Sequence, residues 1–167
     1  MNKVIFSLVL IFSLVVLMSN KKHGIEFSVK DFVRMTKSKK EKIPPCMQMY
    51  YSIEKYSDSF NIPKEYAYGI AYKETRYQGP FHWGYNYKQK SGAGAVGPMQ
   101  IMLGTARNLN DDGVSRDKLM TDIEYNVMTS MKLMRKLYDK YGSWGIALGC
   151  YNTGTPCVNG YAREILS

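Results

Sequence analysis

One glutamate stands where a helix would turn its apolar face inward. The segment 66–75 follows Pro63, and proline suits the first turn of a helix because its missing N–H would be unpaired there. Glu74 is four residues after Ile70, so both side chains project from one helical face. A carboxyl among apolar neighbours favours its neutral form, which a general acid needs near neutral pH. Glu74 is therefore a candidate acid; an ion pair with a base such as Arg76, or a helix end turned to solvent, is the structural alternative.

Helical periodicity also marks two longer segments. Apolar residues recur every three or four positions over 46–60 and over 122–141. The second segment is the longest predicted helix, because Thr121 and Glu124 fit a capping box and Gly142 can end it. Between the long segments, 91–98 is too rich in glycine for a helix and predicts a turn or small hairpin. Shorter helices are predicted over 99–109, 143–151 and 158–166.

The first 20 residues predict a targeting segment. Residues 4–18 contain only two polar side chains, both serines. The length of this apolar segment is within the range of signal peptides and shorter than a typical membrane-spanning helix. Small residues are poorly placed for cleavage, so an uncleaved membrane anchor held through residues 4–18 is an alternative to a signal peptide. Residues 21–45 predict a basic tether, and 46–167 a single folded domain with a core of its own.

The net charge of +9 is concentrated outside the predicted domain. Residues 21–45 hold eight basic and three acidic side chains, whereas 46–167 hold 14 basic and 11 acidic ones. A nucleic-acid-binding domain needs its basic face on the folded part, so this distribution argues against a nucleic-acid partner. A basic segment beside an apolar one instead suits an anionic membrane surface or a cell wall.

Three cysteines leave the redox state open. One disulfide is compatible with an extracytoplasmic site, with Cys46–Cys157 and Cys150–Cys157 as the pairings to test, and three reduced thiols are equally compatible. The only histidines are His23 and His82, and no cysteine spacing fits a metal site, so neither a metal nor another cofactor is expected.

A stretch rich in aromatic residues follows the Glu74 helix. Residues 78–87 include Phe81 and Trp83 among glycines and a proline, a composition that predicts an irregular loop. Aromatic side chains on such a loop can stack against sugar rings, or they can form a small cluster that pins the loop. Trp83 is the candidate for a ligand contact.

Three separated motifs resemble those of the lytic transglycosylases of the soluble-transglycosylase type, a lysozyme-like family. The family shows a helix ending in Glu-Ser, a Gly-Leu-Met-Gln segment followed by Thr-Ala, and an Ala-Tyr-Asn near the end. Here these read Glu74-Thr75, then 97–100 as Gly-Pro-Met-Gln with Thr-Ala at 105–106, then 150–152 as Cys-Tyr-Asn. The resemblance covers about residues 46–165. It implies a mainly α, lysozyme-like α+β fold, in which a helical domain carries a small hairpin or irregular loop beside the substrate.

The resemblance also implies a reaction and a set of residues. Members of the family cleave the β-1,4 bond between N-acetylmuramic acid and N-acetylglucosamine in peptidoglycan. Their glutamate, here Glu74, protonates the leaving oxygen and then acts as base while the 6-hydroxyl of muramic acid closes a 1,6-anhydro ring. Carried over, Tyr151 is placed against the Glu74 carboxyl. The residues expected to bind substrate are Thr75, Met99, Gln100, Tyr151 and Asn152, with Trp83 added from the aromatic loop.

The distribution of carboxylates agrees with such a reaction. Ordinary glycosidases use two carboxylates that flank the bond, yet no Asp or Glu lies between Thr75 and Asn110. A site with one carboxylate suits a nucleophile supplied by the substrate. The alternatives are a hydrolytic muramidase that recruits Asp111, Asp112 or Asp117, and a non-catalytic peptidoglycan-binding module.

The biological setting stays open at this point. A cell-envelope location is expected, with peptidoglycan glycan strands as the partner. The enzyme could remodel its own cell wall, serve a secretion machine, or belong to a phage virion that opens a local hole.

Overall fold

The computed structural model describes residues 43–110 and 113–167. The predicted targeting segment and nearly all of the predicted tether lie outside these residues, as do Asp111 and Asp112. Within the described ranges no helix has the length and apolarity needed to cross a bilayer. The described part is mainly α, with seven helices and only isolated β-bridges, which confirms the expected fold class.

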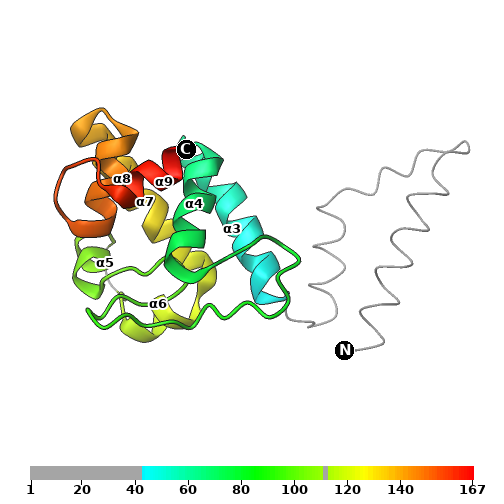
Figure 1. The fold of residues 1–167 in the computed structure, drawn as a ribbon. Helices are drawn as coiled ribbons and strands as arrows, with labels where there is room; N and C mark the ends of the chain where they lie inside the picture. The colour runs from blue at the N-terminus through cyan, green and yellow to red at the C-terminus, as the bar shows by residue number, and fades with distance from the viewer. Residues whose placement is uncertain (1–42, 111–112) are drawn as a thin grey trace, which may run out of the picture. The chain divides into compact units, whose positions relative to one another are not determined.

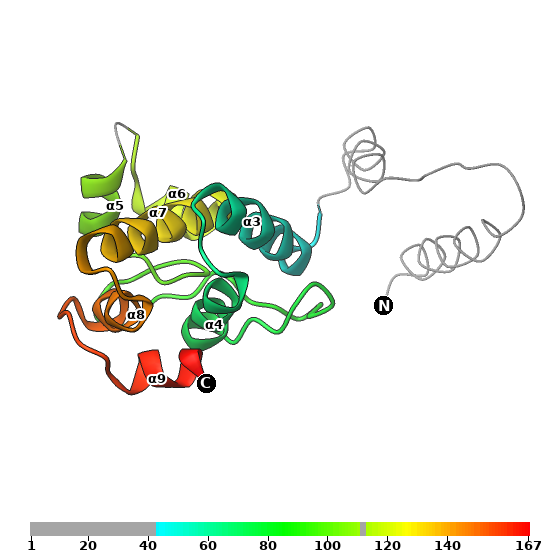
Figure 2. The same cartoon turned by 90° about the horizontal axis from the view of Figure 1, so that it is seen from above.

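The helices are α3 (Pro45–Ser59), α4 (Lys64–Thr75), α5 (Leu103–Leu109), α6 (Arg116–Thr121), α7 (Ile123–Tyr141), α8 (Trp144–Thr153) and α9 (Gly160–Leu166). Helix α7 packs against α3 and α8, and α4 packs against α3 and α9 (Figures 1 and 2). The C-terminal helix therefore lies beside the helix that carries Glu74, although some 90 residues separate them in the chain.

Helix α7 forms the centre of the core. Its buried positions include Val127, Met131 and Met134, which belong to the predicted apolar stripe and have no exposed surface. The helix begins one residue later than predicted, because the side chain of Asp122, and not Thr121, accepts the capping hydrogen bond from the Tyr125 N–H at 2.9 Å. Gly142 ends it in the left-handed conformation with φ of 64°, as predicted.

The glycine-rich segment forms a compact turn and not a regular strand pair. Val96 bridges to Lys90 on one side and to Ile101 on the other. Because Val96 and Ile101 exchange both backbone hydrogen bonds at 3.1 Å, the chain cannot be helical there, and α5 begins at Leu103 instead of the predicted Met99. The short helix α6, capped by Ser115, has no counterpart among the predicted elements.

A buried asparagine fixes this turn to α7. The Asn126 amide donates to the carbonyl oxygens of Val96 at 3.0 Å and Leu119 at 2.9 Å, and its oxygen accepts from the Met99 N–H at 3.0 Å. Gly97 has φ of +80°, and a Cβ there would lie 2.3 Å from the Leu119 oxygen and 2.4 Å from the Asn126 amide nitrogen. Only glycine fits that position, for both conformational and steric reasons.

Candidate active site

Glu74 lies in the last turn of α4 and is half-buried. Ala67, Ile70 and Ala71 form the fully buried face of the same helix, so the carboxyl projects at the edge of the core, as its spacing predicts. Burial raises the pKa of Glu74 above its ordinary value, and this effect exceeds the opposing influence of a hydrogen bond from Tyr161 and of the Lys73 charge. A raised pKa keeps a larger fraction of the carboxyl protonated near neutral pH.

The alternative of an ion pair with Arg76 is not what the structure contains. Arg76 is exposed, adopts φ of 59° as the C-cap of α4, and holds its guanidinium 5.2 Å from the centre of the Tyr72 ring. Within the described residues Glu74 forms no ion pair.

Tyr161 on α9 makes the direct contact with the candidate acid. Its hydroxyl donates a hydrogen bond of 2.7 Å to Oε1 of Glu74. Burial and the neighbouring Glu74 charge raise the pKa of Tyr161, so the phenol stays neutral and remains a donor. Nothing in the three motifs points to Tyr161. The available signal was weak: a tyrosine in the helical segment that closes the chain, with no other assignment.

Tyr151 on α8, the tyrosine of the third motif, forms its hydrogen bonds with the glycine-rich segment and with α7. Its hydroxyl donates to the Met99 carbonyl oxygen at 2.7 Å and lies 2.8 Å from the Ser130 hydroxyl. Because the single phenolic proton is used on Met99, Ser130 is the donor in the second contact. Burial and, after it, the charge of Glu74 raise the pKa of Tyr151, but the hydrogen bond to the carboxyl comes from Tyr161.

Two residues predicted to bind substrate are buried in the described structure. Met99 has no exposed surface, whereas Met102 in the same segment is 43% exposed and can be reached from solvent. Thr75 is 3% exposed, and its hydroxyl donates to the Pro98 carbonyl oxygen at 2.8 Å and contacts the Tyr85 hydroxyl at 2.7 Å. In the described structure both residues join the Glu74 helix and the glycine-rich turn to the core, and their contacts with substrate stay a prediction.

Gln100 and Asn152 are both accessible and both partly engaged. The Gln100 amide nitrogen donates to the carbonyl oxygens of Gly97 at 2.8 Å and Gln89 at 3.1 Å, and its backbone has φ of 50°. Asn152 is exposed, and its side-chain oxygen accepts from Asn159 at 3.3 Å. Asn159 is in turn the N-cap of α9, so Asn152 contacts the residue that begins the helix of Tyr161.

The aromatic loop divides into buried and exposed rings. Tyr77 and Tyr85 are buried, and the Tyr77 hydroxyl donates to the Cys46 carbonyl oxygen at 2.8 Å, so these two rings pin the loop. Phe81 and Trp83 are 75% and 54% exposed, and their ring centres lie 6.2 Å apart. An exposed pair of this kind is free to contact a ligand.

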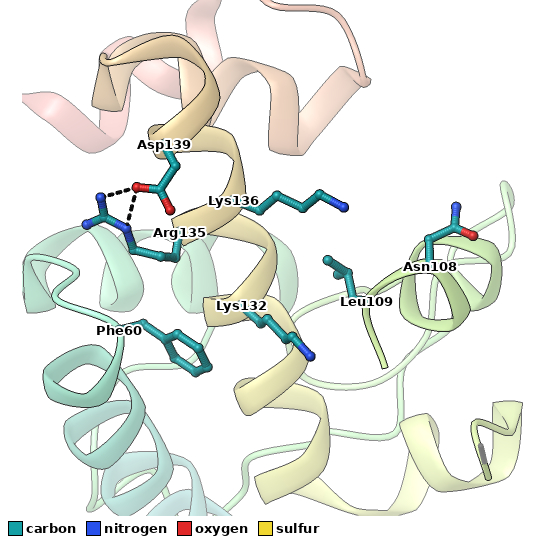
Figure 3. Close-up of a pocket in the computed structure, with 7 residues that line it drawn as sticks. All are labelled: Phe60, Asn108, Leu109, Lys132, Arg135, Lys136 and Asp139. Carbon is teal, nitrogen blue, oxygen red and sulfur yellow. Dashed lines mark hydrogen bonds and ion pairs between the residues drawn. The ribbon is translucent and has the colours of Figure 1, made fainter. Parts of the chain in front are cut away.

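The cysteines and a surface hollow are two further features of the described part. Cys46 and Cys150 are buried, Cys157 is exposed, and all three are free thiols. No group of residues in the described ranges could hold a metal ion. A hollow of about 310 Å³ opens between α5, α7 and the end of α3 (Figure 3). It is lined by Phe60, Asn108, Leu109, Lys132, Arg135, Lys136 and Asp139, none of which is a predicted site residue.

Comparison with known proteins agrees with this arrangement. Residues 51–164 match the family described as the transglycosylase SLT domain. The soluble lytic murein transglycosylase of Escherichia coli strain K12 is 31% identical over 106 residues, which is 60% of this chain and 15% of that protein. The chain therefore corresponds to a small part of the curated relatives it matches.

Solved structures give the same result. The 70-kDa soluble lytic transglycosylase of Escherichia coli superposes with a TM-score of 0.51 at 31% identity, covering 69% of this chain and 18% of that one. A complex of the 70-kDa soluble lytic transglycosylase with bulgecin A gives the same TM-score at 29% identity. An inactive mutant of the lytic transglycosylase Slt from Pseudomonas aeruginosa, at 16% identity, shares the fold, also with a TM-score of 0.51.

Proposed function

Because this chain belongs to the SLT family of transglycosylases, we propose that it cleaves the β-1,4 bond between N-acetylmuramic acid and N-acetylglucosamine in peptidoglycan. Glu74 serves as the general acid and then as the general base. The reaction adds no water and leaves 1,6-anhydro-muramic acid ends.

Glu74 performs two proton transfers in this scheme. In the first, its carboxyl donates a proton to the glycosidic oxygen as the bond from that oxygen to C1 of muramic acid breaks. In the second, the resulting carboxylate takes the proton of the 6-hydroxyl of the same sugar while that oxygen bonds to C1. The carboxyl is thereby restored and atoms balance without a water molecule.

The neighbourhood of Glu74 supports both steps. Burial raises the pKa of Glu74, which favours the protonated form needed for the first step. The Tyr161 hydroxyl, 2.7 Å from Oε1, stabilises the carboxylate that the first step produces. The site thus favours the protonated Glu74 carboxyl and still stabilises the carboxylate that forms during the reaction.

The observation that carries the proposal is the half-buried Glu74 carboxyl with no second carboxylate in the segment that follows it. No other Asp or Glu occurs between Thr75 and Asn110, so the segment that follows the acid supplies no second carboxylate. A hydrolase needs such a group to activate water on the opposite face of the sugar. A nucleophile within the substrate removes that need.

The setting follows from the substrate. We place the protein in the cell envelope, acting on peptidoglycan glycan strands, and the murein named in its curated relative supports this choice. Membrane association through residues 4–18 remains a proposal, because these residues lie outside the described ranges. A role in opening the wall locally, for a secretion machine or a phage virion, is likewise a proposal that the same product would fit.

The mass of the products tests the reaction. Purified sacculi digested by the full-length protein and then treated with borohydride should yield muropeptides whose anhydro ends resist reduction and are one water lighter than hydrolysed ends. Predominantly reducible ends would overturn the transglycosylase and favour a muramidase using Asp111, Asp112 or Asp117. Binding of sacculi without cleavage by the folded protein would favour the non-catalytic module.

A further inference from the structure

Helix α9 contacts two consecutive residues at the end of α4. Tyr161 donates to Glu74, and three residues further along α9 the Glu164 carboxylate lies 2.6 Å from the Lys73 ammonium. Residues three apart lie on one side of a helix, so both partners face α4 together. Figures 1 and 2 show α9 running beside α4 in both views.

A close contact between the Ile165 side chain on α9 and the α4 backbone at Gly69 fixes this register. A Cβ on Gly69 would lie 2.7 Å from Cγ2 of Ile165, which is closer than real Cβ atoms come. Gly69 therefore lets Ile165 settle against the α4 backbone, next to the residue that holds Lys73. The contact places Tyr161 and Glu164 opposite their partners without relying on the exposed ion pair alone.

The position of Lys73 follows from these contacts. Its ammonium is bound by Glu164 and lies 5.8 Å from the centre of the Tyr161 ring, whose hydroxyl reaches Glu74. The charge of Lys73 still acts on Glu74, where it lowers the pKa and opposes the effect of burial. Any change that frees this ammonium, or leaves it unneutralised, strengthens that opposition.

We infer that Glu164 is a positioning residue, which holds the Lys73 ammonium against α9 and so helps to keep Glu74 in its protonated form. The inference rests on the proposed function, since a protonated Glu74 matters only if it is the acid. Glu164 acts on Glu74 through Lys73, so Glu164 itself need not touch the substrate.

The other groups around Glu74 do not duplicate this role. Tyr151 from α8 and Tyr161 from α9 have raised pKa values and stay neutral. Arg76 acts on Glu164 and lowers its pKa slightly further after Lys73, but it is not among the groups that shift Glu74. Lys73 is thus the one cation among the described residues whose charge acts on the acid.

The test measures the Glu74 pKa directly and through activity, on the full-length protein. The direct readout is NMR titration of the carboxyl carbon, and the second is the alkaline limb of the pH–rate profile for sacculus lysis. Glu164→Gln should move both to lower pH, because the released Lys73 charge favours the carboxylate. The shift should be a fraction of a pH unit, since the Glu164 side chain is 66% exposed and solvent screens the pair.

Two further variants isolate the route through Lys73. Lys73→Met should move the Glu74 pKa upward, and adding Glu164→Gln to Lys73→Met should cause no further shift. Glu65→Gln is the matched control: it removes one exposed carboxylate from the first turn of α4 and should leave both readouts unchanged.

Several outcomes would overturn the inference. An unchanged Glu74 pKa in Glu164→Gln would reduce the ion pair to a surface contact. An equal shift with and without Lys73 would mean that the Glu164 charge acts directly on Glu74. Failure of the proposed function is recognised separately, because it would abolish the anhydro products of the wild-type protein and leave the NMR titration intact.

Discussion

Two tyrosines on the neighbouring helices α8 and α9 use their hydroxyls differently. On α8, the Tyr151 hydroxyl donates a hydrogen bond to the Met99 carbonyl oxygen and accepts one from Ser130. On α9, the Tyr161 hydroxyl donates a hydrogen bond to the Glu74 carboxylate. Tyr151 belongs to a recognisable motif and Tyr161 to none. Membership of a motif therefore does not tell whether a side chain meets the reacting group or holds the wall beside it.

The reason lies in what each helix packs against. Helix α8 contacts α7, and a Tyr151 hydroxyl directed there meets a serine and the glycine-rich turn. Helix α9 contacts α4, and its Tyr161 and Glu164 bind Glu74 and Lys73 in the last turn of α4. Four variants, from the largest expected effect to the smallest, test this division between the two tyrosines.

Glu74→Gln removes the carboxyl to which Tyr161 donates its hydrogen bond. Wall lysis should fall by about 10²–10⁴-fold, because an amide of the same shape cannot transfer a proton. A zymogram with the full-length variant measures the loss. Near-normal lysis by a folded variant would remove Glu74 from the mechanism.

The same variant carries its own control for folding. Glu74 has a raised pKa in the folded protein, so its contribution to stability is present at low pH and is lost as pH rises through that pKa. The glutamine has no charge to bury. Its melting temperature should therefore equal or exceed that of the wild type at neutral pH, with a smaller difference at pH 4.

Tyr161→Phe should give the next largest effect on rate. A hydrogen bond to a charged group contributes about 1.5–3 kcal/mol, which predicts a loss of about 10- to 100-fold if the bond stabilises the carboxylate formed during the reaction. Since this bond lowers the Glu74 pKa, its removal should also move the alkaline limb of the pH–rate profile to higher pH. An unchanged rate and limb would make Tyr161 a structural residue.

Tyr151→Phe should act mainly on stability. The Met99 carbonyl and the Ser130 hydroxyl would lose their partner, at a cost of about 1–3 kcal/mol in the free energy of unfolding. Urea unfolding measures that cost, while the rate of the folded fraction and the position of the alkaline limb should change little. A shift of the alkaline limb of the pH–rate profile in Tyr151→Phe, with none in Tyr161→Phe, would contradict this division of roles between the two tyrosines.

Trp83→Ala extends the comparison to an aromatic side chain that the core does not hold. Its ring is 54% exposed and contacts Phe81, so the melting temperature should barely change. If the ring stacks on a sugar, glycan binding should weaken by about 2- to 10-fold, as expected for a contact of about 0.5–1.5 kcal/mol. A pull-down with purified sacculi measures binding. A lower melting temperature with unchanged binding would assign Trp83 to loop packing.

Local patterns predicted much of this protein correctly. The periodicity of apolar residues located α7 to within one residue and placed Glu74 on the inner edge of α4, because side-chain direction in a helix depends only on position along it. Gly142 marked the end of α7 for an equally local reason, the left-handed backbone that glycine adopts freely. The motifs around Glu74 and the glycine-rich segment identified the family.

The roles of individual side chains within those motifs were decided only by the tertiary structure. The motifs predict that Thr75 and Met99 contact substrate. In the folded chain both side chains are buried, because the glycine-rich turn packs on the end of α4. Tyr161 reaches Glu74 only because α9 lies against α4, where Gly69 leaves room for the Ile165 side chain. A contact across 87 residues depends on how helices pack, and no local pattern along the chain encodes that distance.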